Sequence, residues 1–348
     1  MKICKIECMK LKKIFTEAVK WALAAMTALI IMNLLTFAYY SPFSELPRAQ
    51  GANTGFLYPE THGVYGLEGY SFAHSDHRGY INRDLPLDKD YILVAGASHT
   101  EGLFLPMKYR FSDILNDMLG AEDTLKVYNI GKSGNFFSVV TQHLDGILGE
   151  FPDAKAIVIE TDTLAYDTKA WLDSMIQTGY DPDETAENLV SGLSGRQKLS
   201  IRLKQSLPLL RELHKQYLTW KEGATGNERQ SDVYTGEFDE DFDNALNSLM
   251  AYIRSRTDKQ VIIVYHPAVS VLKDGSMKIL TNGCEEHFAK ACRDNGIDFI
   301  DMSDTFLKEY ETRHIVPNGF FNTTMGSGHT NRAAHRMMAE AIYKVLKK

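Results

Sequence analysis

Two kinds of segment alternate along most of this chain of 348 residues. Short apolar runs rich in β-branched residues have the length of buried strands, and they lie at residues 91–95, 125–130, 155–160, 260–265 and 297–301. Longer stretches with helical periodicity separate them, and we expect helices at 108–119, 136–149, 240–257, 283–295 and about 331–346. The alternation predicts a three-layer α/β/α sandwich around a parallel sheet of about five strands.

The spacing of the strands indicates one large insertion. The third and fourth strands are about 100 residues apart, and the additional chain lies at about 166–240. We expect a helix from Gln197 to Lys221 and a polar segment from Glu222 to Asp241. A lid or a partner-docking element is one interpretation, and a surface elaboration without function is the other.

The first 40 residues do not follow this pattern. Residues 1–20 hold six lysines and two glutamates, whereas residues 21–40 hold no charged residue and have aromatic side chains at both ends. About 20 apolar residues can cross a bilayer as a helix, and lysines that precede such a helix place the N-terminus in the cytoplasm. The sequence therefore predicts a signal anchor that crosses the cytoplasmic membrane once, with the main domain outside the cytoplasm.

Besides a buried helix of a soluble protein, against which the lack of a polar face argues, the anchor has two alternatives. Thr36-Phe37-Ala38 is a small-x-small site at which a signal peptide could be cleaved, although the apolar run is long for one. A cytoplasmic enzyme with a membrane tail is the second alternative. Residues 41–69 contain several Pro and Gly residues and are expected to form an irregular linker, which leaves residues 70–348 for the α/β domain.

Net charge argues against one class of partner, and cysteine spacing argues against a disulfide. The whole chain carries −7 and residues 1–20 carry +4, which leaves −11 for the remainder. An acidic body argues against nucleic-acid binding, which needs a basic face. Cys284 and Cys292 would lie about 12 Å apart on one helix, too far for a disulfide. No metal or organic cofactor is expected.

The first expected strand ends in a turn that could carry chemistry. Gly96-Ala97-Ser98 follows it directly, and Gly102 lies four residues after the serine. A strand-to-helix turn exposes the hydroxyl of such a serine and leaves backbone N–H groups free for an oxyanion. Ser98 is therefore the candidate nucleophile, and an ordinary turn with a helix cap is the alternative.

Further polar residues follow the other strands, whose carboxyl ends share one edge of the sheet. The loop from Asn129 to Asn135 contains two glycines, which allow a tight turn with backbone donors facing a cleft. Asn135 could donate its amide to an oxyanion or cap a helix. The remaining candidates for substrate binding or support are His99, Thr161, Asp162, His266 and Asn331. Thr161 and Asp162 could instead cap the next element, and His266 could be a structural histidine.

A histidine near the C-terminal end could supply the base that a serine nucleophile needs. His329 lies within Gly326-Ser327-Gly328-His329-Thr330-Asn331, just before the last expected helix. Glycines there let the backbone bring the imidazole close to another loop, and imidazole is the natural base near neutral pH. His335, inside the helix, is expected to be structural. Ser98 and His329 together predict acyl transfer.

Taken in order, these residues resemble the SGNH, or GDSL, esterases and acyltransferases. The residues that are similar to the family's blocks are Gly96, Ser98 and Gly102 in the first, Asn129, Gly131 and Gly134 in the second, and His329 and Asn331 in the last. Residues 76–83 resemble the lead-in of membrane-anchored members associated with cell-surface polysaccharide acylation. The resemblance covers roughly residues 70–348 without the insertion, and it implies a flavodoxin-like SGNH fold.

The resemblance also implies roles. Ser98 would attack an acyl carbonyl, and His329 would act as the base. The N–H groups of Ser98 and Gly134, with the Asn135 side chain, would hold the oxyanion. The implied substrate is an acylated cell-envelope glycan or another ester, with water or a sugar hydroxyl as acceptor and a membrane protein as a partner in acyl transfer. The alternative function is a non-catalytic SGNH-like scaffold that binds glycan or a membrane partner.

Three departures from the family pattern bear on activity. Ala97 replaces the aspartate of the first block, and Thr161-Asp162-Thr163 replaces a Gly-x-Asn-Asp block. Gly326 stands where an aspartate normally orients the histidine. The candidates to replace that aspartate are Asp301, Asp304 and Glu160. A backbone carbonyl in the same role, a Ser–His dyad and an inactive site are the alternatives.

Overall fold

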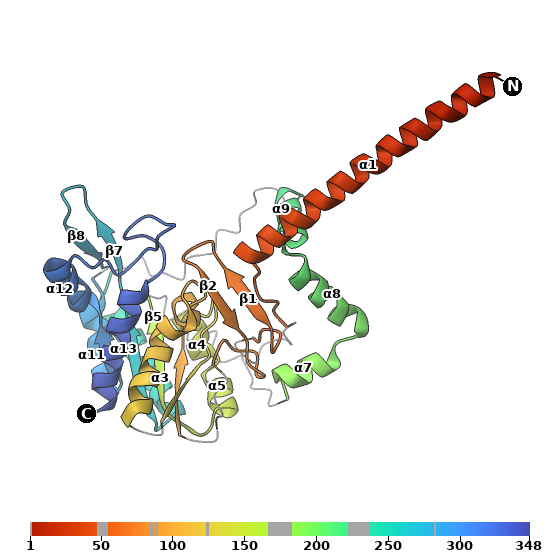
Figure 1. The fold of residues 1–348 in the computed structure, drawn as a ribbon. Helices are drawn as coiled ribbons and strands as arrows, with labels where there is room; N and C mark the ends of the chain where they lie inside the picture. Colours follow the sequence, from red (N-terminus) through yellow and green to blue (C-terminus); the bar gives the residue numbers. More distant parts are fainter. Residues whose placement is uncertain are drawn as a thin grey trace.

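The computed structural model describes residues 2–46, 55–83, 87, 90–122, 125–165, 183–221, 237–281 and 283–348. Its centre is a sheet of five parallel strands in the order β4–β3–β5–β6–β9 (Figure 1). These strands are β3 (Tyr91–Ala95), β4 (Lys126–Asn129), β5 (Ala154–Thr161), β6 (Gln260–Tyr265) and β9 (Asp298–Asp301). In chain order this is 2-1-3-4-5, the flavodoxin-like arrangement. Each expected strand is confirmed to within one residue at either end.

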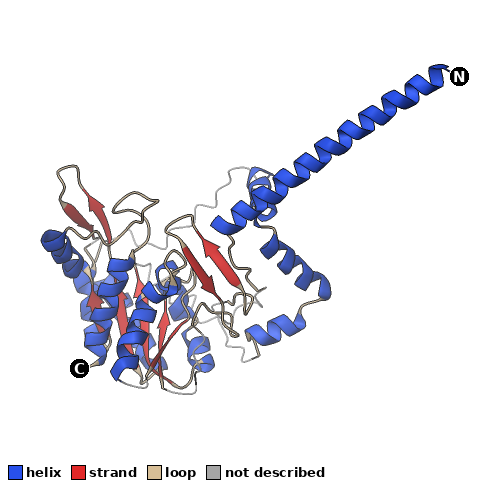
Figure 2. Cartoon of the chain, in the orientation of Figure 1, coloured by secondary structure: helices blue, strands red, loops and turns tan. Residues whose placement is uncertain are grey.

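Helices cover both faces of the sheet, as Figure 2 shows. One face packs against α3 (Phe111–Glu122), α12 (Ser303–Arg313) and α13 (Arg332–Leu346). The other packs against α4 (Phe137–Gln142), α5 (Leu144–Glu150), α10 (Glu240–Arg256) and α11 (Glu285–Asp294). Ile92 and Val94 point to the first face, and Leu93 and Ala95 to the second, as the two-residue period of a strand requires. The three-layer α/β/α sandwich is confirmed.

Several helices differ from the expected ones. The stretch at 136–149 is interrupted at His143, and the helix expected over 197–221 is two helices, α8 (Gly195–Ser206) and α9 (Pro208–Lys221). Proline lacks an N–H and suits the first turn of a helix, so Pro208 begins a new helix instead of continuing α8. The insertion also contains α7 (Ala186–Gly192), and a 3-10 turn, η1 (Met107–Tyr109), precedes α3. Neither α7 nor α12 was expected.

Two antiparallel hairpins were also not expected. One pairs β1 (His62–Tyr65) with β2 (Ser71–His74), and the other pairs β7 (Ala268–Val271) with β8 (Met277–Leu280). The first lies beside the central sheet and crosses the border that we drew at residue 69 (Figure 1). Phe43, Phe56 and Leu57 are buried. Residues 55–69 therefore belong to the folded domain and not to a linker.

The N-terminal segment forms one long helix, α1 (Lys2–Tyr39), which projects away from the body (Figure 1). Its part from Lys12 to Tyr39 is long and apolar enough to cross a membrane. Immediately after it, Ser41 pairs with Val64 of β1. The expected span at 21–40 therefore lies within α1 except for Tyr40, and the chain that follows it is joined to the first hairpin. Its orientation in a membrane stays a prediction.

Candidate active site

The turn after β3 presents Ser98 at the first residue of the short helix α2 (Ser98–Glu101). A side chain at Gly96 would clash with the Thr100 hydroxyl and the Glu160 carboxylate, so only glycine fits there. Glu160 Oε2 accepts hydrogen bonds from the Ala97 N–H at 3.1 Å and from the Thr100 hydroxyl at 2.7 Å. The end of β5 thereby fixes the serine turn.

Glu160 is in turn held by His266, which follows β6 directly. Its Oε1 lies 2.8 Å from His266 Nε2, and both side chains are about 1% exposed. Burial by itself raises the pKa of the Glu160 carboxyl, but its hydrogen bonds to His266, Thr100 and Ala97 lower the pKa overall. His266, a candidate substrate ligand, therefore supports the carboxylate that shapes the nucleophile turn.

The structure brings the predicted nucleophile and base together. His329 Nε2 lies 2.9 Å from Ser98 Oγ, within hydrogen-bond distance, although 231 residues separate them. The imidazole stacks on the Phe104 ring, with centroids 4.2 Å apart, and contacts the His99 ring at a centroid distance of 4.7 Å. These contacts restrict the orientation of the ring, with its Nε2 toward the serine.

The acid that orients His329 is Glu68, which is none of the three candidates from the sequence. Its Oε2 lies 2.5 Å from His329 Nδ1, and its Oε1 accepts the backbone N–H of His329 at 2.7 Å. Of the three candidates, Glu160 bonds His266, and Asp301 accepts the N–H of Ser303 at 2.8 Å. Ser98, His329 and Glu68 have the connectivity of a Ser-His-acid triad.

Glu68 comes from the loop between β1 and β2, which Asn322 ties to the histidine loop. Asn322 accepts the Gly69 N–H at 2.8 Å and donates to the Gly66 carbonyl at 2.9 Å. Gly328, at φ +77°, lies so close to Glu68 Oε1 that a Cβ atom there would clash with it. The glycine before the histidine thus lets the two loops meet, as the sequence predicted.

Position 326 cannot take over the role of Glu68. Gly326 has φ +78°, which side-chain-bearing residues rarely adopt, and its Cβ would lie 3.2 Å from Val271 Cγ2. The acid was missed because the segment around Glu68 was assigned to a linker. The available signal was Gly66-Leu67-Glu68-Gly69, an acid between two glycines, much like the glycine-flanked histidine.

The expected oxyanion loop lies against the serine turn. Lys132 donates its N–H to the Gly96 carbonyl at 3.0 Å, and Glu101 Oε2 accepts both the N–H and the hydroxyl of Ser133. Gly134 has φ +90°, which favours glycine, and Asn135 is buried. Among the described residues, no acceptor is bonded to the N–H groups of Ser98 and Gly134. Both N–H groups are therefore available as donors.

A chain of hydrogen bonds fixes the protonation of His99. The Phe111 N–H donates to His335 Nδ1 at 3.0 Å, and burial lowers the pKa of His335 to about 3, so the proton of neutral His335 is on Nε2. This proton points to the Thr330 hydroxyl at 3.2 Å, which in turn donates to His99 Nδ1 at 2.9 Å. Burial also lowers the pKa of His99 well below 6.5. Neutral His99 therefore carries its proton on Nε2, 4.0 Å from Asp162.

The other candidates have different positions. The Asp162 side chain is 43% exposed beside His99, and burial of its carboxyl together with the charge of Glu160 raises its pKa. Thr161 Oγ1 donates to the Thr163 carbonyl at 2.5 Å. Asn331 caps α13, because its Oδ1 accepts N–H groups of the first turn at 2.9 and 3.4 Å. Asp162 is thus beside the site, whereas Thr161 and Asn331 shape local turns.

Residues 76–83 support the loop after β4. Asp76 accepts the Tyr128 hydroxyl at 2.5 Å and the Asn82 amide at 3.3 Å. Asn82 in turn exchanges hydrogen bonds with the backbone of Asn129 at 2.8 and 2.9 Å. Asn129 then donates to the Thr100 carbonyl at 2.7 Å and accepts the Gly131 N–H at 2.7 Å. Residues 76–83 therefore do not enter the site themselves but hold Asn129, which in turn bonds the helix that carries Ser98.

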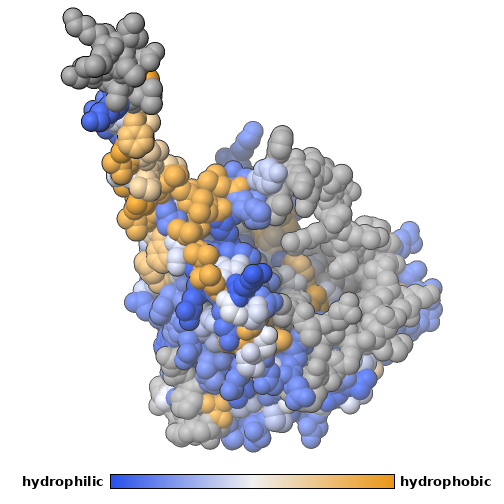
Figure 3. Space-filling model, turned by 90° about the vertical axis from the view of Figure 1, so that its right-hand side faces the viewer, coloured by the Kyte–Doolittle hydropathy of each residue, from blue (hydrophilic) through white to orange (hydrophobic). Residues whose placement is uncertain are grey.

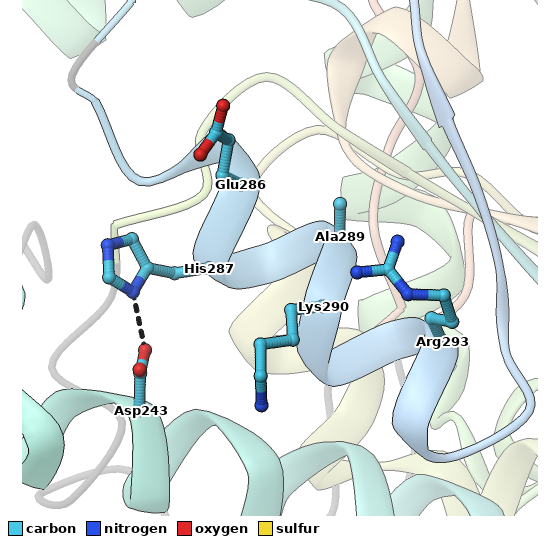
Figure 4. Close-up of a pocket in the computed structure, with 6 residues that line it drawn as sticks. All are labelled: Asp243, Glu286, His287, Ala289, Lys290 and Arg293. Atoms are coloured by element: carbon cyan, nitrogen blue, oxygen red, sulfur yellow. Dashed lines mark hydrogen bonds and ion pairs between the residues drawn. The ribbon is translucent and has the colours of Figure 1, made fainter.

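A separate hollow lies on the flank of the molecule, between α10 and α11 (Figure 4). Asp243, Glu286, Lys290 and Arg293 are among its lining residues, and His287 Nδ1 lies 2.5 Å from Asp243 Oδ1. It contains none of the triad residues. Among the described residues, no cluster of three or more His, Cys, Asp or Glu side chains is placed to hold a metal ion.

No protein-family model and no curated protein matches the chain. Solved structures with a similar fold include the psychrotrophic esterase EstA from Pseudoalteromonas sp. (11% identity, 74% of this chain and 97% of that chain, TM-score 0.38). Another is Axe2, an acetylxylan esterase from Geobacillus stearothermophilus (12%, 75% and 95%, 0.39). A third is a member of the lipolytic protein G-D-S-L family from Veillonella parvula (12%, 75% and 100%, 0.34). Sequence identities and TM-scores this low carry no argument about activity, which is therefore argued from the geometry of the site.

Proposed function

We propose that the chain is a membrane-anchored serine ester hydrolase or O-acyltransferase of SGNH type. One observation carries the proposal: His329 bonds Ser98 Oγ through Nε2 at 2.9 Å and Glu68 through Nδ1 at 2.5 Å. A serine is a weak nucleophile without an adjacent base, and a third group must hold that base in the correct tautomer. The same arrangement removes the sequence-based objection that nothing supports the histidine.

In the first half-reaction, Ser98 Oγ attacks the carbonyl carbon of a bound ester while His329 Nε2 takes the hydroxyl proton. Glu68 stabilises the resulting imidazolium through Nδ1–H. The N–H groups of Ser98 and Gly134 are the donors for the tetrahedral oxyanion. Collapse breaks the ester C–O bond, and His329 returns the proton to the departing alcohol. The product is an acyl-serine at residue 98.

In the second half-reaction, an acceptor hydroxyl attacks the acyl-serine with His329 again as base. Water yields a carboxylic acid, and a sugar hydroxyl yields a new ester. An acylated cell-envelope glycan as substrate and a membrane acyl-transfer partner follow from the anchor and the family resemblance. The site lacks the third-block asparagine of that family, and the Nε2–H of neutral His99, whose ring lies 4.7 Å from that of His329, is a candidate additional donor.

A fluorophosphonate probe tests the serine chemistry on the full chain purified in detergent. Labelling should occur, disappear in Ser98→Ala and become much slower in His329→Ala. Circular dichroism of each variant checks that it folds. A folded wild-type chain that a small probe does not label contradicts an enzyme and favours the scaffold function. Addition of deacylated glycan acceptors to a chromogenic acetyl ester then distinguishes transfer from hydrolysis by the product.

The location of the domain needs a separate test. Protease added outside intact cells should degrade residues 41–348 and spare the basic N-terminus. Degradation only after the cells are opened contradicts an extracytoplasmic domain and leaves the triad chemistry untouched.

A further inference from the structure

The helix pair formed by α8 and α9, termed here the α8–α9 pair, contacts α1 within its apolar span. Asn33 of α1 donates its amide to the Ser206 carbonyl at 3.0 Å and accepts the Leu209 N–H at 3.3 Å. Both contacts flank the break between α8 and α9. Asn33 is six residues before the end of α1, about 9 Å along a helix. The break therefore lies beside the apolar span, short of its outer end.

The first turn of α9 is also fixed to the chain that leaves α1. Arg211 donates to the carbonyls of Pro42 and Phe43 at 3.0 and 3.3 Å. The Asn33 bonds lie before Tyr40, where the expected span ends, and the Arg211 bonds lie after it. Within the described part of the chain, four side-chain hydrogen bonds thus join the α8–α9 pair to α1 and to the residues that follow it.

The surface of the α8–α9 pair carries an exposed apolar stripe. Leu210, Leu213 and Tyr217 follow each other at helical spacing on one side of α9 and are 50–54% exposed. Leu199 and Leu203 of α8 are 58% and 49% exposed. In Figure 3 the orange surface of α1 continues onto the body where the two meet. Because Asn33 of α1 bonds both sides of the break between α8 and α9, the stripe lies next to the surface expected to lie in lipid.

Charge indicates which kind of lipid surface fits. α8 carries four basic side chains and no acidic one, at Arg196, Lys198, Arg202 and Lys204. The chain beyond residue 20 is otherwise strongly acidic, with −11 overall. The pair combines exposed leucines on α9 with basic side chains on the neighbouring α8, a combination typical of segments that lie in the interface of anionic membranes. α8 runs crosswise to α1 in Figure 1, as such a helix must if α1 crosses the bilayer.

We propose that the α8–α9 pair lies on the outer surface of the bilayer that α1 crosses. Leu203, Leu210, Leu213 and Tyr217 enter the boundary between headgroups and acyl chains, and the basic residues of α8 contact lipid phosphates. The Asn33 amide, a costly group in a lipid-facing helix, is satisfied by the α8–α9 break. The pair thereby holds the catalytic domain at one height and orientation above the membrane. This inference rests on the proposed membrane anchor.

Site-directed fluorescence on the full chain tests the proposal. In a Cys4→Ser, Cys8→Ser background, one cysteine at position 210 or 213 is labelled with bimane, and the protein is reconstituted into phosphatidylglycerol-containing vesicles. Nitroxide lipids should quench both labels, at a depth of about 5–10 Å below the headgroups. A label at Leu280, which is 47% exposed on β8, is the matched control and should be quenched only by aqueous iodide.

A label at Met26 of α1 separates the two proposals. If lipid nitroxides quench the Met26 label but not the labels at 210 and 213, the membrane contact of the α8–α9 pair is wrong and the anchor stands. If none of the three labels is quenched by lipid nitroxides, the anchor itself is contradicted. Protection of positions 210 and 213 that appears only after a second membrane protein is added also overturns the proposal, in favour of a protein partner. Replacement of Arg202 and Lys204 by Gln should move the 210 label toward water, which checks the role of charge.

Discussion

Glu68 holds His329 by both of its oxygens, one on the ring Nδ1 at 2.5 Å and one on the backbone N–H at 2.7 Å. The two residues are 261 positions apart and come from a hairpin loop and from the loop before the last helix. The carboxylate therefore sets the tautomer, the orientation and the backbone position of the histidine at once. Activity should therefore depend strongly on this residue.

Replacement of Glu68 by Gln should lower kcat by on the order of 10³–10⁴-fold without unfolding the chain, because an amide favours the wrong tautomer of the histidine. Hydrolysis of a chromogenic acetyl ester and circular dichroism measure the two effects. Glu68→Asp keeps the charge on a shorter side chain and should be less impaired. Equal activity of Glu68→Gln and wild type would show that Glu68 has no catalytic role.

Moving the acid to position 326 should not rescue that variant. The double variant Glu68→Gln/Gly326→Asp should be no more active than Glu68→Gln, because Gly326 has φ +78° and its Cβ would approach Val271. The comparison uses kcat for the same ester. Recovery of activity would mean that this loop can adopt a different backbone in which the introduced carboxylate reaches the histidine.

The sheet and the serine–histidine pair were predictable from the sequence because each depends on local signals. Five apolar runs with strand length determined the strands, and glycines beside Ser98 and His329 marked turns that present a side chain. Glu68 was missed because its role arises from a contact between distant loops. The Pro and Gly residues at 41–69 are typical of a linker, and β1 and β2, at four residues each, are too short to show a clear strand pattern among them.

Gly328→Ala should lower kcat by on the order of 10²-fold, because the new Cβ displaces Glu68 Oε1 from the His329 N–H. Gly275→Ala is the matched control for backbone strain. Gly275 also has a positive φ, +83°, but a Cβ there meets nothing within 4 Å. Both variants should lose some stability, whereas only the first should lose activity. An equal loss of kcat in both would assign the effect to strain and not to Glu68.

Thr330→Val should destabilise the fold by about 1–3 kcal/mol, because the buried Nε2–H of His335 loses its acceptor. Thr330→Ser keeps the hydroxyl between His335 and His99 and should cost much less. Urea unfolding of the detergent-solubilised chains measures both values. Equal destabilisation by Val, which lacks the hydroxyl, and Ser, which keeps it, would show that the hydrogen bonds of the Thr330 hydroxyl do not stabilise the fold.

Glu150 should make stability fall as pH rises. Burial raises the pKa of this carboxyl from 4.5 to about 7, while its Oε2 accepts the Tyr80 hydroxyl at 3.0 Å. The folded chain therefore binds more protons than the unfolded chain between pH 4.5 and 7, and its free energy of unfolding decreases across that window. The loss is about 3 kcal/mol at most by about pH 8.

Glu150→Gln keeps an acceptor for Tyr80 and cannot ionise, so its advantage in stability over wild type should be small at about pH 5 and grow toward about pH 8. Urea unfolding of both chains at each pH measures the difference, and a constant difference would show that Glu150 titrates normally in the fold.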